Sequence, residues 1–129
     1  MVLCVQDTTE LDFTGRDAEG LAEIGNGGGR GMLQHAGLAV TEDGRLLGPL
    51  QCFWRNRVKV PEGETRKQRR GRWTVSDSWA QVATGIGPVD GTRLLHVGDR
   101  LADVFGFTQT CSRLGHGWVV RAQHNRKCG

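Results

Sequence analysis

The sequence contains no tyrosine, only three prolines and no apolar run long enough to cross a bilayer. A membrane-spanning helix needs about 20 consecutive apolar residues, and the N-terminus has no basic segment followed by an apolar one that could act as a secretion signal. We therefore expect a cytoplasmic protein with no membrane partner. The four cysteines form no Cys-x-x-Cys pair and no Cys/His cluster at zinc-ligand spacing, which predicts free buried thiols.

The overall composition is typical of a single soluble domain. With 129 residues, of which 37% are hydrophobic and 24% charged, the chain can bury a core, and we expect a single domain over residues 1–129. The net charge of +3 is small but unevenly placed. Residues 66–72, RKQRRGR, hold five cations in seven positions, and residues 121–127, RAQHNRK, add three more. Such runs favour contact with phosphate backbones, although a solvated loop explains the first run equally well.

The hydrophobic pattern predicts an α/β protein. Two apolar runs flank TEDG at residues 41–44, where Asp-Gly is typical of a tight antiparallel hairpin. The stretch SDSWAQVATGI has apolar residues at helical spacing, with Ser76 or Asp77 as N-cap. Residues 56–72 are polar and basic and predict an exposed loop. The predicted strands cover residues 2–6, 32–40, 45–55, 94–97 and 117–123, and the predicted helices cover residues 76–86 and about 101–113.

The glycine-rich stretch GNGGGRG at residues 25–31 could be taken for a phosphate-binding loop. A P-loop needs a preceding strand and a Lys-Ser or Lys-Thr at its end, and this stretch has neither. We therefore interpret it as a connection between strands.

Two acids stand where apolar runs end, Asp7 near the N-terminus and Asp99 after LLHV. A right-handed crossover can bring the fourth strand parallel beside the first, which gives the strand order 3-2-1-4-5. Both carboxylates would then lie at the carboxyl ends of neighbouring parallel strands and could together hold a hard divalent cation. Alternatively, Asp99 is the N-cap of the helix that begins near Leu101. For Asp103 we expect an exposed side chain or an ion pair with Arg100.

Four blocks of the sequence resemble the core blocks of DDE transposases of the insertion sequence four family, in that family's order. The blocks are QDTTELDFTG, GNGGGRGMLQHAGLAVTEDGRLLGPL, HVGDRLADVF and WVVRAQHNR. The resemblance covers nearly the whole chain, although Leu101 stands where the family often has Glu.

The resemblance implies a ribonuclease H-like mixed sheet with flanking helices. It assigns Asp7 and Asp99 as catalytic and metal-binding acids for Mg²⁺, which Mn²⁺ could replace. The implied reaction is metal-dependent cleavage and strand transfer in cut-and-paste DNA transposition. The implied partners are double-stranded DNA, namely transposon ends and target, and a second transposase molecule in a dimer. The residues that we expect to contact DNA are Arg66, Lys67, Arg69, Arg70, Arg121 and Arg126.

The chain departs from the family in its third acid. The family's Glu lies in a Tyr-Arg-Glu-Lys block after the last strand seen here, and this chain has no such block; the DNA-binding region expected before the first acid is also missing. We therefore expect a truncated core that is inactive alone. One alternative is a catalytically dead remnant that binds DNA or inhibits a full-length transposase. A self-sufficient nuclease would need Glu10, Asp12 or Asp103 to replace the missing acid.

Overall fold

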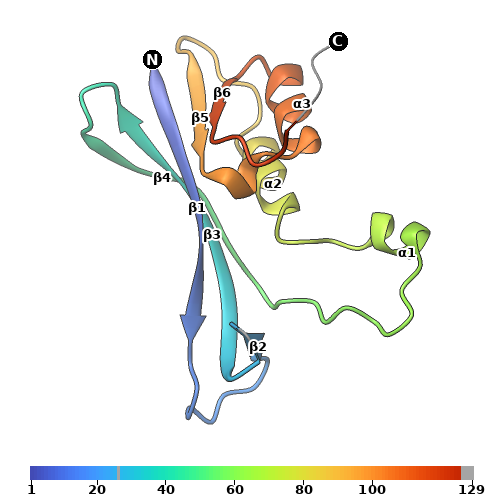
Figure 1. Ribbon diagram of the computed structural model, residues 1–129. Helices are drawn as coiled ribbons and strands as arrows, with labels where there is room; N and C mark the ends of the chain where they lie inside the picture. Colours follow the sequence, from blue (N-terminus) through green and yellow to red (C-terminus); the bar gives the residue numbers. More distant parts are fainter. Residues whose placement is uncertain (26, 126–129) are drawn as a thin grey trace.

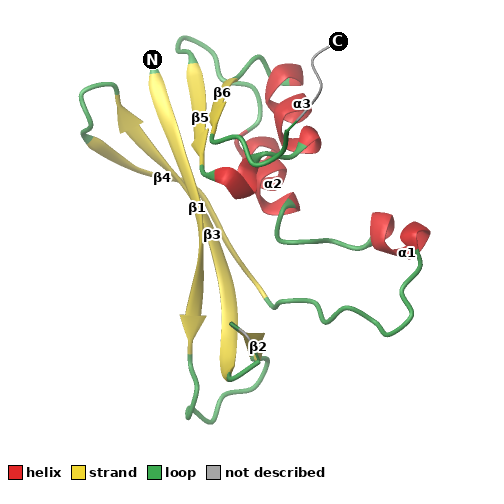
Figure 2. Ribbon diagram, in the orientation of Figure 1, coloured by secondary structure: helices red, strands yellow, loops and turns green. Residues whose placement is uncertain are grey.

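The computed structural model describes residues 1–25 and 27–125. It shows a mixed α/β fold in which α2 and α3 pack against one face of a strongly curled mixed sheet, while α1 lies on an extended arm (Figures 1 and 2). None of the helices in these ranges has both the length and the hydropathy needed to cross a bilayer. The elements are β1 (Val2–Asp12), β2 (Ala22–Ile24), β3 (Gly29–Thr41), β4 (Leu46–Arg55), α1 (Arg66–Gly71), α2 (Asp77–Ile86), β5 (Leu94–Gly98), the 3₁₀ helix η1 (Arg100–Ala102), α3 (Phe105–Arg113) and β6 (Gly117–Val120).

The pairing of the sheet follows the expected meander and crossover. β1 is antiparallel to β3 and parallel to β5, and β5 is parallel to β6. The β3–β4 hairpin turns at Asp43-Gly44, where Gly44 adopts a φ of +87°. The strand order nevertheless differs from the predicted 3-2-1-4-5. The path is β2-β3-β1-β5-β6 with β4 also paired to β3, because a sixth strand, β2, pairs with the start of β3.

Three local predictions are wrong. β1 does not end at residue 6, because β3 pairs with it as far as Asp12. The predicted helix over residues 101–113 is divided into η1 and α3, since Asp103 and Val104 leave the helical backbone conformation. The predicted loop over residues 56–72 contains the helix α1.

The core lies between the sheet and the two packed helices. Trp79 of α2 and Phe107 and Cys111 of α3 are fully buried in one cluster, and Cys4 and Val82 belong to a second cluster over β1. The expectation of free buried thiols holds for Cys4 and Cys111, whereas Cys52 is only half-buried and Cys128 lies outside the described residues.

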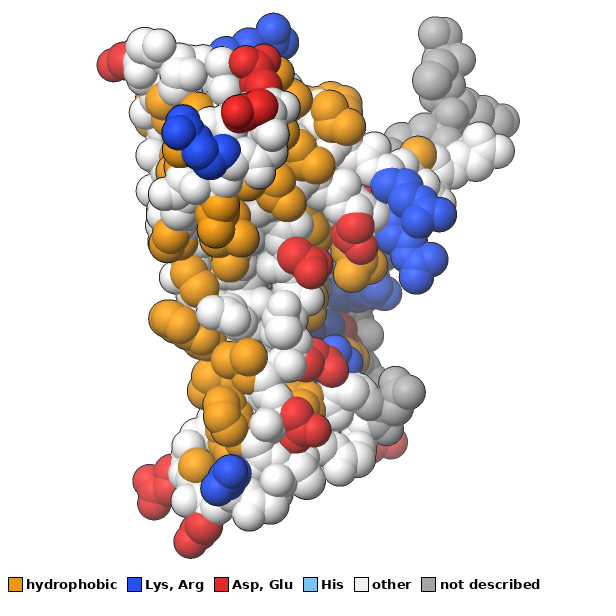
Figure 3. Space-filling model, turned by 90° about the vertical axis from the view of Figure 1, so that its left-hand side faces the viewer, with side chains coloured by type: hydrophobic (Ala, Val, Ile, Leu, Met, Phe, Trp, Pro, Cys, Tyr) orange, Lys and Arg blue, Asp and Glu red, His pale blue; other side chains and the backbone are white. Residues whose placement is uncertain are grey.

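The other face of the sheet is not covered by any described element. Exposed apolar side chains on this face include Val5, Leu38, Leu46 and Trp54, which strand alternation and register place together. Figure 3, viewed from the side of the β3–β4 hairpin, shows hydrophobic side chains along most of the length of the molecule.

A chain of polar side chains crosses the core between the sheet and the helices. Thr8 bonds to His35 Nδ1, and His35 Nε2 lies 3.1 Å from the Gln6 Oε1 atom. Gln6 Nε2 lies 2.7 Å from His96 Nδ1, and His96 Nε2 lies 3.0 Å from His116 Nδ1. The Gln6 amide donates to His96 Nδ1 and accepts from His35 Nε2. Each of the three imidazole rings then carries its proton on Nε2, and every hydrogen bond is donated in the direction from Thr8 to His116. The chain links β3, β1, β5 and the loop before β6.

Candidate nucleic-acid interface and acidic pair

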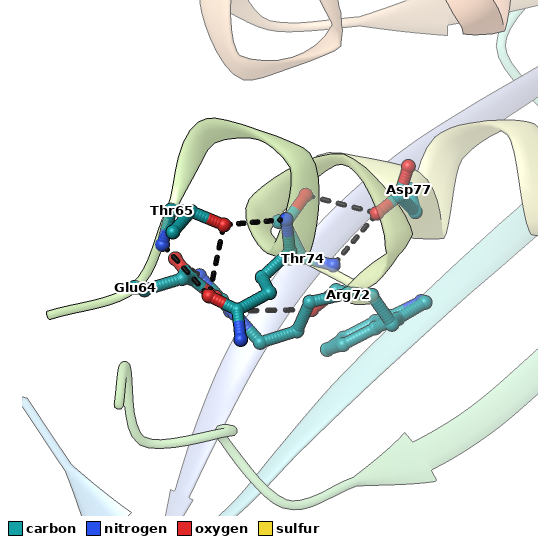
Figure 4. A network of polar contacts seen from close by, with 7 residues as sticks. Glu64, Thr65, Arg72, Thr74 and Asp77 are labelled. Atoms are coloured by element: carbon teal, nitrogen blue, oxygen red, sulfur yellow. Dashed lines mark hydrogen bonds and ion pairs between the residues drawn. The ribbon is translucent and has the colours of Figure 1, made fainter. Parts of the chain in front are cut away.

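The N-terminus of α1 is stabilised by two reciprocal side-chain caps. The Thr65 hydroxyl accepts a hydrogen bond from the Gln68 N–H at 3.3 Å, and the Gln68 side chain accepts from the Thr65 N–H at 2.9 Å. This is a capping box, and the Thr-x-x-Gln spacing is its signal in the sequence. Figure 4 shows that the helix is tied at its other end, where Arg72 reaches back to Glu64 and Thr74 contacts Asp77.

The arginines of α1 converge on one pocket of about 440 Å³, here called the arginine pocket. Arg66, Arg69 and Arg70 stand at positions i, i+3 and i+4 and therefore share one face of the helix. Lys67 does not line the pocket, so the structure separates it from the three arginines with which the sequence grouped it. The residues that line the arginine pocket are Arg66, Arg69, Arg70, Arg72, Thr74 and Asp77.

The charges of the arginine pocket are only partly compensated. Arg72 donates two hydrogen bonds to Glu64, at 2.6 and 3.2 Å, and this pairing lowers the pKa of the Glu64 carboxyl. Asp77 is engaged with the N–H and hydroxyl of Thr74 at 2.6 and 2.9 Å. The other three arginines make no ion pair with any described residue. The pocket is therefore suited to an anion with several acceptor oxygens, such as a phosphate.

Asp7 lies on β1, and Asp99 directly follows β5, the parallel strand beside β1. The last aligned pair of β1 and β5 is Val5 and Val97, and each acid follows two residues later. Asp7 is exposed in the middle of β1, not at its end as predicted, since β1 continues past the end of β5. The pairing of these two strands therefore brings acids from distant parts of the sequence to within two residues of one aligned pair, Val5 and Val97.

Asp99 has the role of a helix cap. Its Oδ1 accepts a hydrogen bond from the Leu101 N–H at 2.8 Å and begins η1. The alternative that Asp99 is an N-cap is thus confirmed, with a 3₁₀ helix in place of the start of a long α-helix. Asp7 makes no hydrogen bond or ion pair within the described residues. Two carboxylates do not form a closed cage, but they match the way Mg²⁺ is commonly held, by one or two carboxylates with waters and substrate oxygens completing the shell.

The other acids considered from the sequence are used elsewhere. Glu10 forms an ion pair with Arg57 at 2.6 Å. Asp12 accepts from the Thr14 N–H at 2.8 Å, and hydrogen bonding by the Thr14 side chain and backbone lowers the pKa of Asp12. Asp103 is not on the surface as expected but buried, and accepts from the backbone N–H groups of residues 123 and 124. Among residues 1–25 and 27–125, no three His, Cys, Asp or Glu side chains come together as metal ligands.

The two remaining cations of the prediction lie near the C-terminus. Arg121 is exposed, and its backbone N–H donates to the Gly98 carbonyl at 3.3 Å. Gly98 is the residue before Asp99, so Arg121 lies near Asp99 along the chain backbone. Arg126 lies outside the described residues. Arg72 is part of the basic run, but the sequence alone assigns it no contact and singles out neither Trp73 nor Thr74. Arg72 and Thr74 line the arginine pocket, and all three residues line a second pocket of about 390 Å³.

No protein-family model matches this chain, and no curated protein matches it either. The resemblance to transposases therefore remains based on the four sequence blocks.

Proposed function

We propose that this chain is part of the catalytic core of a DDE-type DNA transposase with a ribonuclease H-like fold, and that it binds double-stranded DNA through the arginine pocket. The observation that supports the proposal most is the convergence of three unpaired arginines, Arg66, Arg69 and Arg70, on one face of a capped helix. Long cationic side chains held at fixed spacing bind phosphate oxygens without reading the base sequence.

Asp7 and Asp99 are the residues that would hold Mg²⁺ or Mn²⁺ in this proposal. A pair of such ions activates the attacking oxygen and stabilises the leaving oxygen in phosphoryl transfer. The chain's own contribution would be to hold Asp7 on β1 and Asp99 just after the parallel strand β5, where the η1 cap fixes the Asp99 side chain. Because no third acid joins them among the described residues, we expect the chain to need a further carboxylate, or a second transposase molecule, for strand cleavage.

A second candidate is a DNA-binding module that has lost catalysis and acts by occupying DNA or by pairing with an active transposase. The absence of a third carboxylate near Asp7 and Asp99 within the described ranges favours it. Both candidates share DNA binding and differ in their response to divalent metal.

The DNA proposal predicts weak, sequence-independent and strongly salt-dependent binding to duplex DNA. The double variant Arg69→Ala/Arg70→Ala should flatten the plot of log K against log salt by up to about two, since each phosphate contact adds about 0.9 to the slope. The measurement is a fluorescence-anisotropy titration of a labelled duplex at several salt concentrations.

Lys67→Ala is the matched control, because it removes one cation from the same helix but from outside the arginine pocket. We expect it to change the slope less than Arg69→Ala does. Equal effects of the two single variants would show that only the net charge of α1 matters, and would contradict a phosphate site in the pocket.

The metal proposal predicts that Mg²⁺ or Mn²⁺ raises the melting temperature of the protein, because a ligand that binds only the folded state stabilises it. Asp7→Asn and Asp99→Asn should each abolish this response, as measured by differential scanning fluorimetry with Ca²⁺-free buffers. Glu42→Gln, which removes an exposed carboxylate elsewhere, serves as control. A metal response that survives in both Asn variants would exclude this pair as the site. Nicking of supercoiled DNA that is lost in both variants would show that a third acid is present after all.

A further inference from the structure

Asp103 is a buried carboxylate that belongs neither to the arginine pocket nor to the acidic pair. It is only 4% exposed, and its Oδ2 atom accepts hydrogen bonds from the backbone N–H groups of Gln123, at 2.7 Å, and His124, at 3.0 Å. Two consecutive backbone N–H groups that point to one oxygen form a concave site suited to an anion. The contacts connect the end of η1 to the segment that follows β6, 20 and 21 positions further along the chain.

The segment after β6, residues 121–125, is held mainly by Asp103. β6 ends at Val120, and all five residues of the segment are exposed and lie outside any helix or strand. Its other backbone hydrogen bond within the described part of the chain runs from the Arg121 N–H to the Gly98 carbonyl at 3.3 Å, which is longer than the usual range of about 2.7–3.2 Å. The two bonds to Asp103 are shorter, and bonds of N–H groups to a carboxylate are about twice as strong as neutral ones.

Asp103 is itself fixed, because the residues on both sides of it belong to the core. Ala102 is fully buried in the core cluster formed by α2 and α3, and Val104 packs against the same cluster. The Asp103 N–H also donates to the Arg100 carbonyl at 3.2 Å and ends η1. Since Asp99 caps the other end of this 3₁₀ helix, one short element holds both acids.

Arg121 is the charged side chain whose backbone this anchor fixes. Its N–H bonds to Gly98, the residue before Asp99, and its guanidinium makes no ion pair with any described residue. An exposed segment near a chain end is ordinarily mobile unless contacts hold it. A mobile cation would have to be ordered when a ligand binds, at a cost in entropy. The contacts with Asp103 order the backbone of Arg121 before any ligand arrives.

We infer that Asp103 is a positioning residue, which holds Arg121 beside the end of β5 so that the guanidinium contacts a phosphate of bound DNA. Asp103 does not touch the DNA in this arrangement, since it is buried and engaged with backbone N–H groups. The inference rests on the proposed function, because it takes DNA as the ligand. It adds a phosphate contact that lies outside the arginine pocket.

Asp103→Asn tests the inference through the sign of its effect on DNA affinity, measured by fluorescence anisotropy with a labelled duplex. The variant removes a negative charge, and charge alone would strengthen binding to DNA. If Asp103 positions Arg121, binding should instead weaken by up to about eightfold at 0.1 M salt, since one phosphate contact changes log K by about 0.9 for a tenfold change in salt. Asp90→Asn, which neutralises an exposed acid before the opposite end of β5, is the matched control and should not weaken binding.

A double-mutant cycle separates positioning from a general loss of structure. Arg121→Ala should weaken duplex binding by about as much as Asp103→Asn does, and the double variant should bind no more weakly than Arg121→Ala alone. An equal loss from Asp103→Asn in the presence and in the absence of Arg121 would overturn the inference. An Asp103→Asn variant that binds as tightly as the wild type, or more tightly, would overturn it as well.

Gln123→Pro is a second variant that keeps every charge, including that of Asp103. It removes the N–H of the shorter of the two bonds, in an exposed segment that contributes nothing to the core. It should weaken duplex binding in the same direction as Asp103→Asn. Without DNA, trypsin should cleave both variants after Arg121 faster than the wild type, because cleavage requires local opening of the segment. Unchanged cleavage in both variants would show that Asp103 is not the anchor.

Failure of the inference can be told apart from failure of the proposed function. If the wild type binds duplex DNA with strong salt dependence and Asp103→Asn binds as tightly, only the positioning role is wrong. If the wild type does not bind duplex DNA, the proposed function is wrong and the inference falls with it.

Discussion

Acidification from pH 6.5 to about pH 4 is expected to remove much of the folding free energy of this protein. Burial lowers the pKa of both His35 and His96 from 6.5 to about 4, so the folded state keeps both rings neutral. The unfolded chain takes up these protons near pH 6.5. Since the folded pKa lies below the unfolded one, stability is complete above pH 6.5 and falls as the pH decreases. One pKa unit corresponds to about 1.4 kcal/mol, which gives on the order of 3 kcal/mol for each ring.

Urea unfolding at a series of pH values measures this effect. The slope of the unfolding free energy against pH should correspond to an uptake of about two protons near pH 5. A loss of this size is large beside the 5–15 kcal/mol typical of a domain. His124→Gln, which alters an exposed histidine, should leave the slope unchanged. Constant stability between pH 7 and pH 5 would show that the buried rings are not held neutral by the fold.

The main pairings of the sheet could be predicted because their signals are local or follow from chirality. Alternation marks the strands, Asp43-Gly44 marks the hairpin, and the right-handed crossover places β5 beside β1. The helix α2 was equally clear, and its N-cap is Ser76, one of the two residues expected. β2 was missed because its three residues, between glycine-rich segments, are too few to show a period.

The candidate site was predicted in composition but not in geometry. The basic run showed that cations gather near residue 70, but only the helix shows that Arg66, Arg69 and Arg70 share a face that excludes Lys67. The signal for that helix is present in the sequence, as Thr65 followed three residues later by Gln68. The second pocket, which Trp73 and Trp79 line, could not be found in this way, since its walls come from three separate segments of the chain.

The polar chain in the core gave no sequence signal at all. Gln6, His35 and His96 lie on three different strands and His116 lies in the loop before β6, and their contacts join residues 20 to 90 positions apart. A single histidine in an apolar strand is compatible with the surface, the core or a ligand site. Only the register of β3, β1 and β5 brings these side chains into one line.

Gln6→Leu is expected to destabilise the protein by about 2–6 kcal/mol, because Gln6 is the central link of this chain. Its amide contacts His35 Nε2 through the oxygen and His96 Nδ1 through the nitrogen, in a position that is almost completely buried. Leucine has a similar volume but no polar atoms, so both imidazole nitrogens lose their partners while they remain in the core. Each unsatisfied buried group costs about 1–3 kcal/mol. Chemical denaturation at pH 7.5 measures the loss.

Gln34→Leu is the matched control for this prediction. Gln34 is also a glutamine in the sheet, on β3, but it is only half-buried on the face away from the helices, and its amide donates one weak hydrogen bond to Cys52 Sγ at 3.3 Å. We expect it to cost less than about 1 kcal/mol, because water can replace that bond. Equal stability of the two leucine variants would show that the His35 and His96 rings hydrogen-bond to other groups or that their unpaired nitrogens cost little free energy. A large loss confined to Gln6→Leu would instead identify the amide as the group that holds the two imidazoles in their neutral, aligned state.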